Sequence, residues 1–425
     1  MSGMLSGPSA PLGSQPKEAD FSYDVDKRHT RSRLWQSVFQ GSTIVGIVVL
    51  TALLINVANQ AFGLAAIENS VAPESLAVDG EPLEDLSKEQ LVSILEAHVS
   101  SGLFRRLEND MPFAERTRED VYSLVMERVV EPQVVQTWSL GDSLFRRAQV
   151  EAQSAQEHPE AVLMFVSWLD AQFVRDPQSP DPVKAGVRTA ILGSLWTIAI
   201  TILFAFPIGV GAAIYLEEYA DDHFVNRVIQ TNINNLAGVP SIIYGILGLA
   251  IFVRALEVVT SGAAFGLLED TTTANGRTLL SAGLTLGLLI LPLIIINAQE
   301  AIRAVPLSLR QAGFGLGATK WQTIWSHVLP NALPGILTGT ILAVSRAVGE
   351  TAPLVVVGAS TYITTDPEGP FSKFTTLPIQ IFQWTARPQA EFRNIAAAAI
   401  IVLLLLLLVL NASAVLMRNR FAKRL

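Results

Sequence analysis

Two side chains of opposite charge, Arg346 and Glu350, interrupt a run from 321 to 363 that otherwise carries no lysine, arginine, aspartate or glutamate. Their four-residue spacing puts both on one face of a helix, where they can neutralise each other. Ionisable groups at membrane depth are costly and usually face a cavity or each other. Because a guanidinium is a planar fork of donors, it suits the oxygen pair of an oxyanion. The pair therefore predicts the lining of an anion pathway, with Glu350 holding Arg346 while the anion is absent. Two alternatives are a structural ion pair and a Glu350 side chain that extends to the outer interface.

The composition places this pair in a membrane protein. The chain has 425 residues, of which 50% are apolar and only 16% are charged, and its mean hydropathy is +0.39. Soluble proteins carry about a quarter charged residues. The apolar residues stand in long blocks rather than in stripes, so lipid is the solvent for those blocks. The chain has no cysteine, which excludes a disulfide framework and a thiolate metal site.

Six windows are long enough to cross a bilayer as helices, which takes about 20 apolar residues. They are Leu34–Ile67, Thr189–Leu216, Val228–Val253, Thr278–Gln299, a run that starts near Val328, and Asn394–Met417. The fold class predicted is therefore an all-α integral membrane protein with six transmembrane helices. If the fifth helix begins near Asn331, Arg346 lies about 22 Å along it, past the midplane towards the outside.

Lysine and arginine residues orient these spans. They gather at both ends of the chain, at Lys17, Lys27, Arg28, Arg31, Arg33, Arg418, Arg420, Lys423 and Arg424. With six spans both ends lie on one side, and the positive-inside rule makes that side the cytoplasm. The segment 300–330, which is also basic, then lies in the cytoplasm. The acidic connection 217–222 does not fit this pattern, but the rule gives acidic residues little weight.

The windows and the charges predict five parts of a multi-pass inner membrane protein. They are a disordered cytoplasmic segment 1–33, a first transmembrane helix 34–66, an acidic periplasmic insert 67–183, a membrane core 184–418 with five transmembrane helices, and a basic cytoplasmic tail 419–425. The first window is predicted to be a membrane anchor, because a long polar stretch precedes it, whereas a signal peptide has a short basic start.

The insert 67–183 differs in charge from the rest of the chain. It carries 22 acidic and nine basic side chains, a balance of −13, whereas the remainder has a balance of +5. Its acidity argues against binding to nucleic acid, whose phosphates it would repel. Ser87 with Gln90, and Thr117 with Asp120, have the spacing of a capping box that begins a helix. We therefore expect a folded, mostly helical unit.

The segment 310–330, with the sequence "RQAGFGLGATKWQTIWSHVLP", is too polar to span but carries signals of two short helices. Gly317 can end the first helix in the left-handed conformation. Thr319 can cap the second, with Gln322 completing a capping box. Trp321, Ile324, Trp325 and Val328 then share one apolar face. The segment predicts a helical elbow on the cytoplasmic surface, either with a cytosolic partner or as an interfacial helix without one.

These residues resemble the cytoplasmic signature of permeases of ABC importers, which is E-A-A, three residues, G, nine residues, then I-x-L-P. The positions that align with it are Gln311, Ala312, Gly313, Gly317, Leu329 and Pro330, of which Ala312, Gly317, Leu329 and Pro330 carry the signature residue. The chain departs from the signature at Gln311, Gly313 and His327. The resemblance implies that this elbow is the coupling helix, which docks into a cleft of a separate ATPase subunit.

Two further stretches narrow the resemblance to phosphate importer permeases of the PstA type. They are "NINNLAGVPSIIYGILGLAIFV" (232–253) and "SRAVGETAPLVVVGAS" (345–360). The resemblance covers residues 185–418 and implies the type I ABC importer permease fold. It also implies a sister permease of the PstC type, an ATPase of the PstB type, a periplasmic phosphate-binding protein of the PstS type, and phosphate as the solute carried past Arg346 and Glu350.

The motifs that the sequence lacks agree with a division of labour between subunits. There is no G-x-x-x-x-G-K-[ST] loop, and no HExxH, CxxC or G-x-S-x-G motif. We therefore expect no enzymatic activity and no cofactor in this chain, with ATP used by the partner ATPase. Two alternatives stay open, namely an importer permease for another solute and a secondary transporter or channel that works alone.

Overall fold

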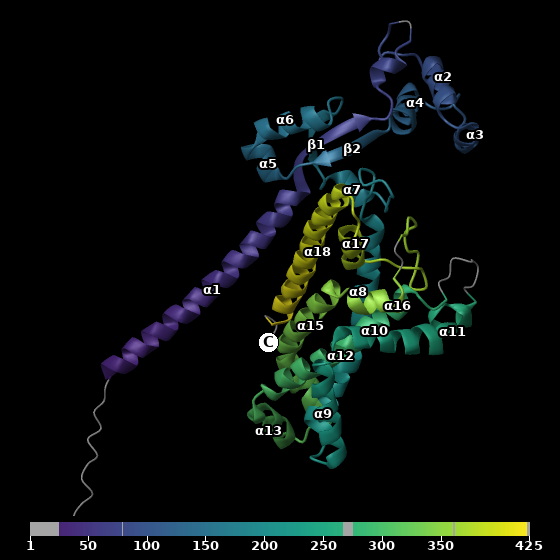
Figure 1. Ribbon diagram of the computed structural model, residues 1–425. Helices are drawn as coiled ribbons and strands as arrows, with labels where there is room; N and C mark the ends of the chain where they lie inside the picture. The colour runs from purple at the N-terminus through teal and green to yellow at the C-terminus, as the bar shows by residue number, and fades with distance from the viewer. Residues whose placement is uncertain (1–24, 79, 267–274, 360–361, 423–425) are drawn as a thin grey trace, which may run out of the picture. The chain divides into compact units, whose positions relative to one another are not determined.

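The computed structural model describes residues 25–78, 80–266, 275–359 and 362–422 (Figure 1). The chain forms two compact units, Met1–Asn56 and Val57–Leu425. In the first unit the described residues belong to helix α1, which runs from Val25 to Ala61 and ends in the second unit. The expected disordered segment 1–33 is thus helical from residue 25, and its residues 1–24 lie outside the described residues. The expected first transmembrane helix 34–66 is also wrong at its end, because Phe62 already begins a strand.

Among the described residues, five helical stretches are long and apolar enough to cross a membrane. They are Arg28–Ala61 in α1, Arg188–Tyr219, Leu279–Arg303, Lys320–Gly349 and Ala390–Arg420. The second joins α8 (Arg188–Ile214) to the π-helical turn η3 (Tyr215–Tyr219), and the third is α12. The fourth joins α14 (Lys320–Thr323), the π-helical turn η6 (Ile324–Val328) and α15 (Leu329–Gly349), and the fifth lies in α18 (Ala390–Ala422).

The third expected span, Val228–Val253, is not one straight helix. It is broken into α9 (Phe224–Ala237) and a second helix made of α10 (Ser241–Gly248) and η4 (Leu249–Ala255), bent by 107°. The break falls at Pro240, which has no N–H to continue the helix and disfavours a helical conformation in the residue before it. If this bent pair crosses as one span, the chain has the six spans that the sequence predicted.

Helix α12 lies at the centre of the membrane core. Two thirds of its most apolar window (67%) is buried inside the protein, against 33% for the windows of α8, α15 and α18. It packs closely on α8, because a side chain at Gly283 or Gly287 would lie within 2.6 Å of Ile200 or Phe204. The remaining elements of the core are short. They are α11 (Glu257–Thr260), η5 (Ala263–Phe265), α13 (Leu307–Gly315), α16 (Ala352–Val357) and α17 (Leu377–Thr385).

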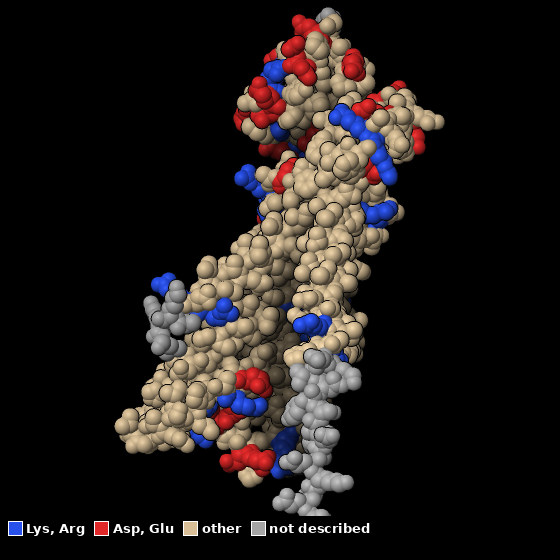
Figure 2. All heavy atoms as spheres, turned by 90° about the vertical axis from the view of Figure 1, so that its left-hand side faces the viewer, with Lys and Arg blue, Asp and Glu red and all other residues tan. Residues whose placement is uncertain are grey.

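The insert contains a sheet that the sequence analysis did not predict. Strands β1 (Phe62–Asn69), β2 (Pro132–Thr137) and β3 (Val162–Ser167) pair antiparallel in the order β2-β1-β3. The central strand β1 was missed because it continues the apolar window of α1 and is largely buried, so it lacks the alternation that marks an exposed strand. Figure 2 shows many of the acidic side chains gathered on the insert.

The helices of the insert follow its capping signals. Both predicted capping boxes are present, with Ser87 and Gln90 at the start of α2 and Thr117 and Asp120 at the start of α4. Hydrogen bonds from the Thr117 backbone N–H and hydroxyl hold the pKa of the Asp120 carboxyl below its usual value. The elements are η1 (Pro73–Leu76), α2 (Lys88–His98), α3 (Ser101–Asp110), α4 (Arg118–Val125), η2 (Met126–Val130), α5 (Leu140–Phe145), α6 (Arg147–Glu157) and α7 (Ala171–Arg175).

Candidate functional site

The first helix of the elbow, α13, is followed by a sharp turn at Gly317, as the sequence predicted. Its φ is +80°, in the left-handed region that glycine adopts without strain. The N–H of Gly317 donates to the carbonyl of Phe314 at 2.9 Å, and the N–H of Ala318 donates to that of Gly313 at 3.1 Å. These two hydrogen bonds form a Schellman motif and satisfy carbonyls at the end of α13.

The second helix of the elbow continues into the fifth span without a break. Thr319 caps it and Gln322 completes the predicted capping box. In η6 the hydrogen-bond pattern widens, and the N–H of Leu329 donates to the carbonyl of Ile324. The prolines at 330 and 334 therefore lie within the helical stretch Lys320–Gly349 and do not end it. The elbow is thus one short helix, α13, joined by a turn to the start of a long one.

The predicted single apolar face of the second helix is wrong. Ile324 and Val328 are almost fully buried, with 2% and 1% of their surface exposed, and belong to the core. Trp321 and Trp325 are 54% and 60% exposed and stack on each other with their ring centroids 5.5 Å apart. Spacing alone placed all four together, but only the packing of the neighbouring helices decides which of them it covers. Phe314 and Leu316 are also exposed, at 48% and 88%, and we call these four exposed apolar side chains of the elbow the elbow patch.

The signature positions divide into exposed and packed residues. Gln311 and Ala312 of α13 are exposed, and Leu329 and Pro330 are half-buried. Gly313 is buried where α13 crosses α14, and a Cβ there would lie 2.8 Å from the Thr323 Oγ1 atom. Glycine at this position thus permits the close approach of the two helices of the elbow.

The charged pair in the fifth span is present but not on one continuous helix. The Arg346 Nε atom lies 3.4 Å from the Glu350 Oε1 atom, and the two side chains are 45% and 18% exposed. Helix α15 ends at Gly349, and Glu350 is in the extended conformation. Within the described parts of the chain, the Nη1 and Nη2 atoms of Arg346 have no hydrogen-bond partner.

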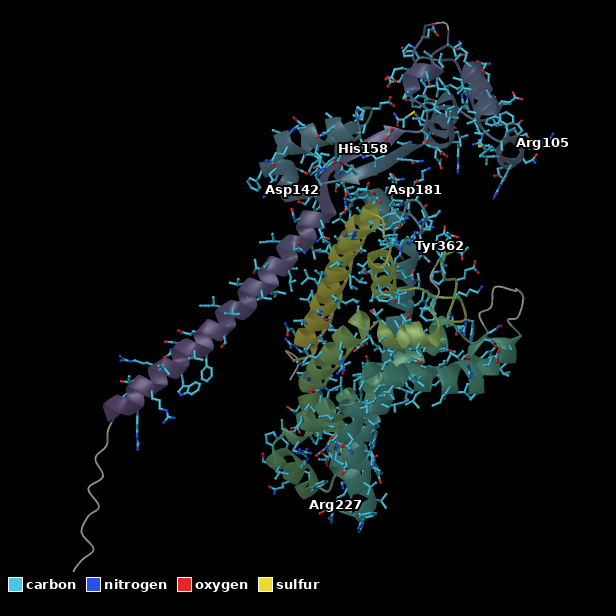
Figure 3. All side chains as sticks on the ribbon, viewed as in Figure 1. Arg105, Asp142, His158, Asp181, Arg227 and Tyr362 are labelled. Atoms are coloured by element: carbon cyan, nitrogen blue, oxygen red, sulfur yellow. The ribbon has the colours of Figure 1, made fainter. Side chains whose placement is uncertain are left out.

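A polar cavity of about 450 Å³ opens between α9, η3 and α12. Gln299 of α12 is only 3% exposed and exchanges two hydrogen bonds with Gln230 of α9, of 2.8 and 3.2 Å. Arg227, which also lines the cavity, lies at the end of the bundle opposite to Asp181 of the insert (Figure 3). The sequence analysis missed this amide pair, because two glutamines 69 residues apart carry no spacing signal.

The sequence analysis also missed the role of the acidic connection after the second span. Glu217 and Glu218 do not lie free in a loop but belong to η3, where each pairs with an arginine. Glu217 pairs with Arg303 at 2.6 Å, and Glu218 pairs with Arg310 at 2.8 Å. The only available signal was that two consecutive glutamates follow one span while Arg303 and Arg310 follow another.

Comparisons with known proteins place these features in a family. A model of the family described as binding-protein-dependent transport system inner membrane component matches residues 205–425. The chain is 32% identical over 255 residues to the phosphate transport system permease protein PstA of Yersinia pestis, a match that covers 60% of this chain and 78% of that protein. It is 31% identical over 208 residues to the phosphate transport system permease protein PstC of Pasteurella multocida. This match covers 47% of this chain and 64% of that protein.

Among solved structures, the chain is similar to the MetNI methionine ABC transporter in an inward-facing conformation. The likeness has a TM-score of 0.41 and 20% sequence identity, and it covers 55% of this chain and 97% of that chain. The insert 67–183 lies outside the residues that the family matches.

Proposed function

Since the chain belongs to the family of binding-protein-dependent transport system inner membrane components, we propose that it is one of two permease subunits of an ATP-driven phosphate importer. A sister permease of the PstC type completes the pathway, and an ATPase of the PstB type supplies the energy. A periplasmic phosphate-binding protein of the PstS type delivers the anion. The chain itself is not an enzyme and holds no cofactor, because ATP is bound by the partner ATPase.

The elbow supports the coupling part of this proposal. Two helices packed through Gly313 and turned at Gly317 present Gln311, Ala312 and the elbow patch on an exposed surface. Exposed tryptophan and phenylalanine side chains are what a cleft in a partner protein would bury. Because α13 lies in the chain between α12 and the helical stretch Lys320–Gly349, a movement of the ATPase against α13 would displace both of these spans.

The Arg346 donors that lack a partner in the described parts of the chain are the observation that favours an oxyanion as the solute. The side chain of Arg346 is 45% exposed, and its guanidinium has two nitrogens without a partner among the described residues, while Glu350 contacts only Nε. The contact between Arg346 Nε and Glu350 is long, at 3.4 Å. Such a guanidinium suits an incoming oxyanion that forms a bidentate pair with it. The likeness to the PstA and PstC proteins points to phosphate among the possible oxyanions.

The solute is tested by deleting the gene in cells whose other phosphate carriers have been removed. Uptake of labelled phosphate is expected to fall to background, and a plasmid carrying the wild-type gene is expected to restore it. Labelled sulfate and methionine serve as parallel solutes whose uptake should not change. Loss of another solute with intact phosphate uptake would contradict phosphate but keep the importer, and loss of none would contradict both.

The proposed orientation places both termini in the cytoplasm, the insert in the periplasm and the elbow in the cytoplasm. Alkaline phosphatase, which is active only outside the cytoplasm, is expected to be active when fused after residue 120 and inactive when fused after residue 315. A reporter that is active only in the cytoplasm should give the opposite pattern at the same two points. Equal activity at both points would contradict the six-span arrangement.

A further inference from the structure

The last turn of the second span, η3, contacts three later elements through three consecutive side chains. We call these contacts the clasp. Its pairs are Glu217 with Arg303 at the end of α12, Glu218 with Arg310 in α13, and Tyr219 with Lys320 at the start of α14. The first two are ion pairs, and in the third the lysine Nζ atom lies 5.1 Å from the centroid of the tyrosine ring. One turn of helix thus holds the end of α12 and both helices of the elbow.

The central pair of the clasp is the buried one. The side chains of Arg310 and Glu218 are only 14% and 8% exposed, whereas Arg303 is 60% exposed. The Nε and Nη2 atoms of Arg310 donate to the Glu218 Oε1 atom at 3.0 and 2.8 Å. Because the pair is shielded from water, salt screens it little and separating the partners leaves a charge uncompensated.

Arg310 also closes the end of α12. Its Nη2 atom donates to the carbonyl of Ile302 at 2.9 Å, and its Nη1 atom donates to that of Val305 at 2.6 Å. The last carbonyls of a helix have no partner within the helix and carry its negative dipole end, so a cation there is favourable. All three nitrogens of the guanidinium are therefore engaged, and they join α13 to η3 and to the end of α12.

Helix α13 has few other buried contacts. Gly313 is its one buried residue and Leu309 is half-buried against the core, whereas Leu307, Phe314 and Leu316 are 71%, 48% and 88% exposed. Because so little of α13 is buried, its position depends on Arg310, on Leu309 and on the crossing at Gly313. The π-helical turn η3 is itself an irregularity, with the N–H of Ala220 bonded to the carbonyl of Tyr215 at 2.9 Å, and such turns often mark functional positions.

We propose that Arg310 is the positioning residue through which movement of the elbow is transmitted to the second span and to α12. This inference rests on the proposed function, because it gives the coupling elbow its mechanical connection. A push on α13 displaces η3 and the end of α12 with it, because breaking the buried pair costs more than moving the three elements together. Lysine cannot replace Arg310, since an ammonium is a point charge without the planar fork that reaches a carboxylate and two carbonyls at once.

The test measures phosphate carried per ATP hydrolysed in proteoliposomes that hold the permease with its sister permease, ATPase and binding protein. Arg310→Lys is expected to lower this ratio about tenfold, within the usual range of coupling free energies. The matched control is Arg147→Lys, which alters an arginine–carboxylate pair of 2.8 Å, with Glu151, in the insert. That pair is 71% and 53% exposed, so the control ratio should stay within about twofold of the wild type. A normal ratio for Arg310→Lys overturns the proposal.

A second measurement separates positioning from general stability. Because the chain has no cysteine, Ser308→Cys provides a single site for a nitroxide label on the exposed side of α13. In detergent-purified protein, Arg310→Lys is expected to increase the mobility of this label at an unchanged melting temperature, and Arg147→Lys should leave the mobility as it is. A lower ratio with unchanged mobility and a lower melting temperature would show a merely structural role and overturn the proposal.

Two outcomes, a variant that does not accumulate and a wild-type complex that carries no phosphate, are resolved by a further variant and by the label mobility. If Arg310→Lys does not accumulate in the membrane, Glu218→Asp keeps both charges but withdraws the carboxylate by one methylene. A normal ratio with Glu218→Asp overturns the proposal, and a lowered ratio with a more mobile label supports it. If the wild-type complex carries no phosphate, the proposed function fails, whereas label mobility still decides whether Arg310 positions α13.

Discussion

Replacing Arg346 with glutamine is expected to abolish phosphate uptake while the protein remains in the membrane. The substitution keeps the approximate length of the side chain but removes the charge and the forked donors. Each charge-assisted hydrogen bond contributes about 1.5–3 kcal/mol, so losing the two bonds offered to an oxyanion should lower uptake by roughly a hundredfold or more. Arg346→Lys is expected to recover little of it, since lysine keeps the charge without the fork. The measurement is initial uptake of labelled phosphate, normalised to membrane abundance by immunoblot.

The matched experiment for Arg346 is the double variant Arg346→Gln/Glu350→Gln. If the pair is only structural, the single variant fails because it leaves the largely buried Glu350 carboxylate unpaired, and the double variant should transport again. If Arg346 receives the anion, the double variant should stay inactive. Glu350→Gln alone should insert normally, because it leaves a half-exposed guanidinium that can reach solvent or the anion. Transport in the double variant would refute the anion-path role.

Gly317→Val is the prediction with the next largest effect. Valine is strained at a φ of +80°, and a residue with a Cβ pays roughly 1–2 kcal/mol there. Because 1.4 kcal/mol is a tenfold change in an equilibrium, the population with a correctly turned elbow should fall about tenfold or more. Uptake and stimulation of the ATPase should fall together, while membrane insertion, read from the fusion reporters, should persist.

Two control variants isolate conformation from size at Gly317. Nothing lies within 4 Å of a Cβ built at Gly317, so Gly317→Asn should couple well, because asparagine tolerates the left-handed conformation. Gly315→Ala lies two residues away in α13, also with open space around its Cβ, and should couple like the wild type. Normal coupling in Gly317→Val, or equal loss in Gly317→Asn, would contradict the role of the turn.

Local signals predicted the elbow and the insert's helix starts well. The left-handed turn at Gly317 and the capping boxes at Thr319, Ser87 and Thr117 are all present, because a cap or a turn is made by residues within a few positions of one another. The fold class and the family are also confirmed, since long apolar windows and signature spacing can be read from the chain alone. The orientation and the roles of Arg346 and Glu350 stay predictions.

The errors fall where distant residues decide the outcome. Strand β1 was taken as the end of a transmembrane helix, because its two pairing partners lie about 70 and 100 residues further along the chain and an isolated apolar run does not show which structure it adopts. The prediction of one apolar face in the second helix of the elbow is wrong for a similar reason. The core covers Ile324 and Val328 but leaves Trp321 and Trp325 exposed.

The sequence by itself determined that this is a membrane protein, where its apolar windows lie and where the elbow turns, because these depend on composition and on contacts between near neighbours. Only the tertiary structure decided which charges meet. Glu218 and Arg310 are 92 residues apart, and no spacing rule links the end of one span to the start of an elbow after another. Burial excludes water from their contact, and Arg310 also donates to the carbonyls of Ile302 and Val305, so the fold uses one side chain to join α13 to η3 and to the end of α12.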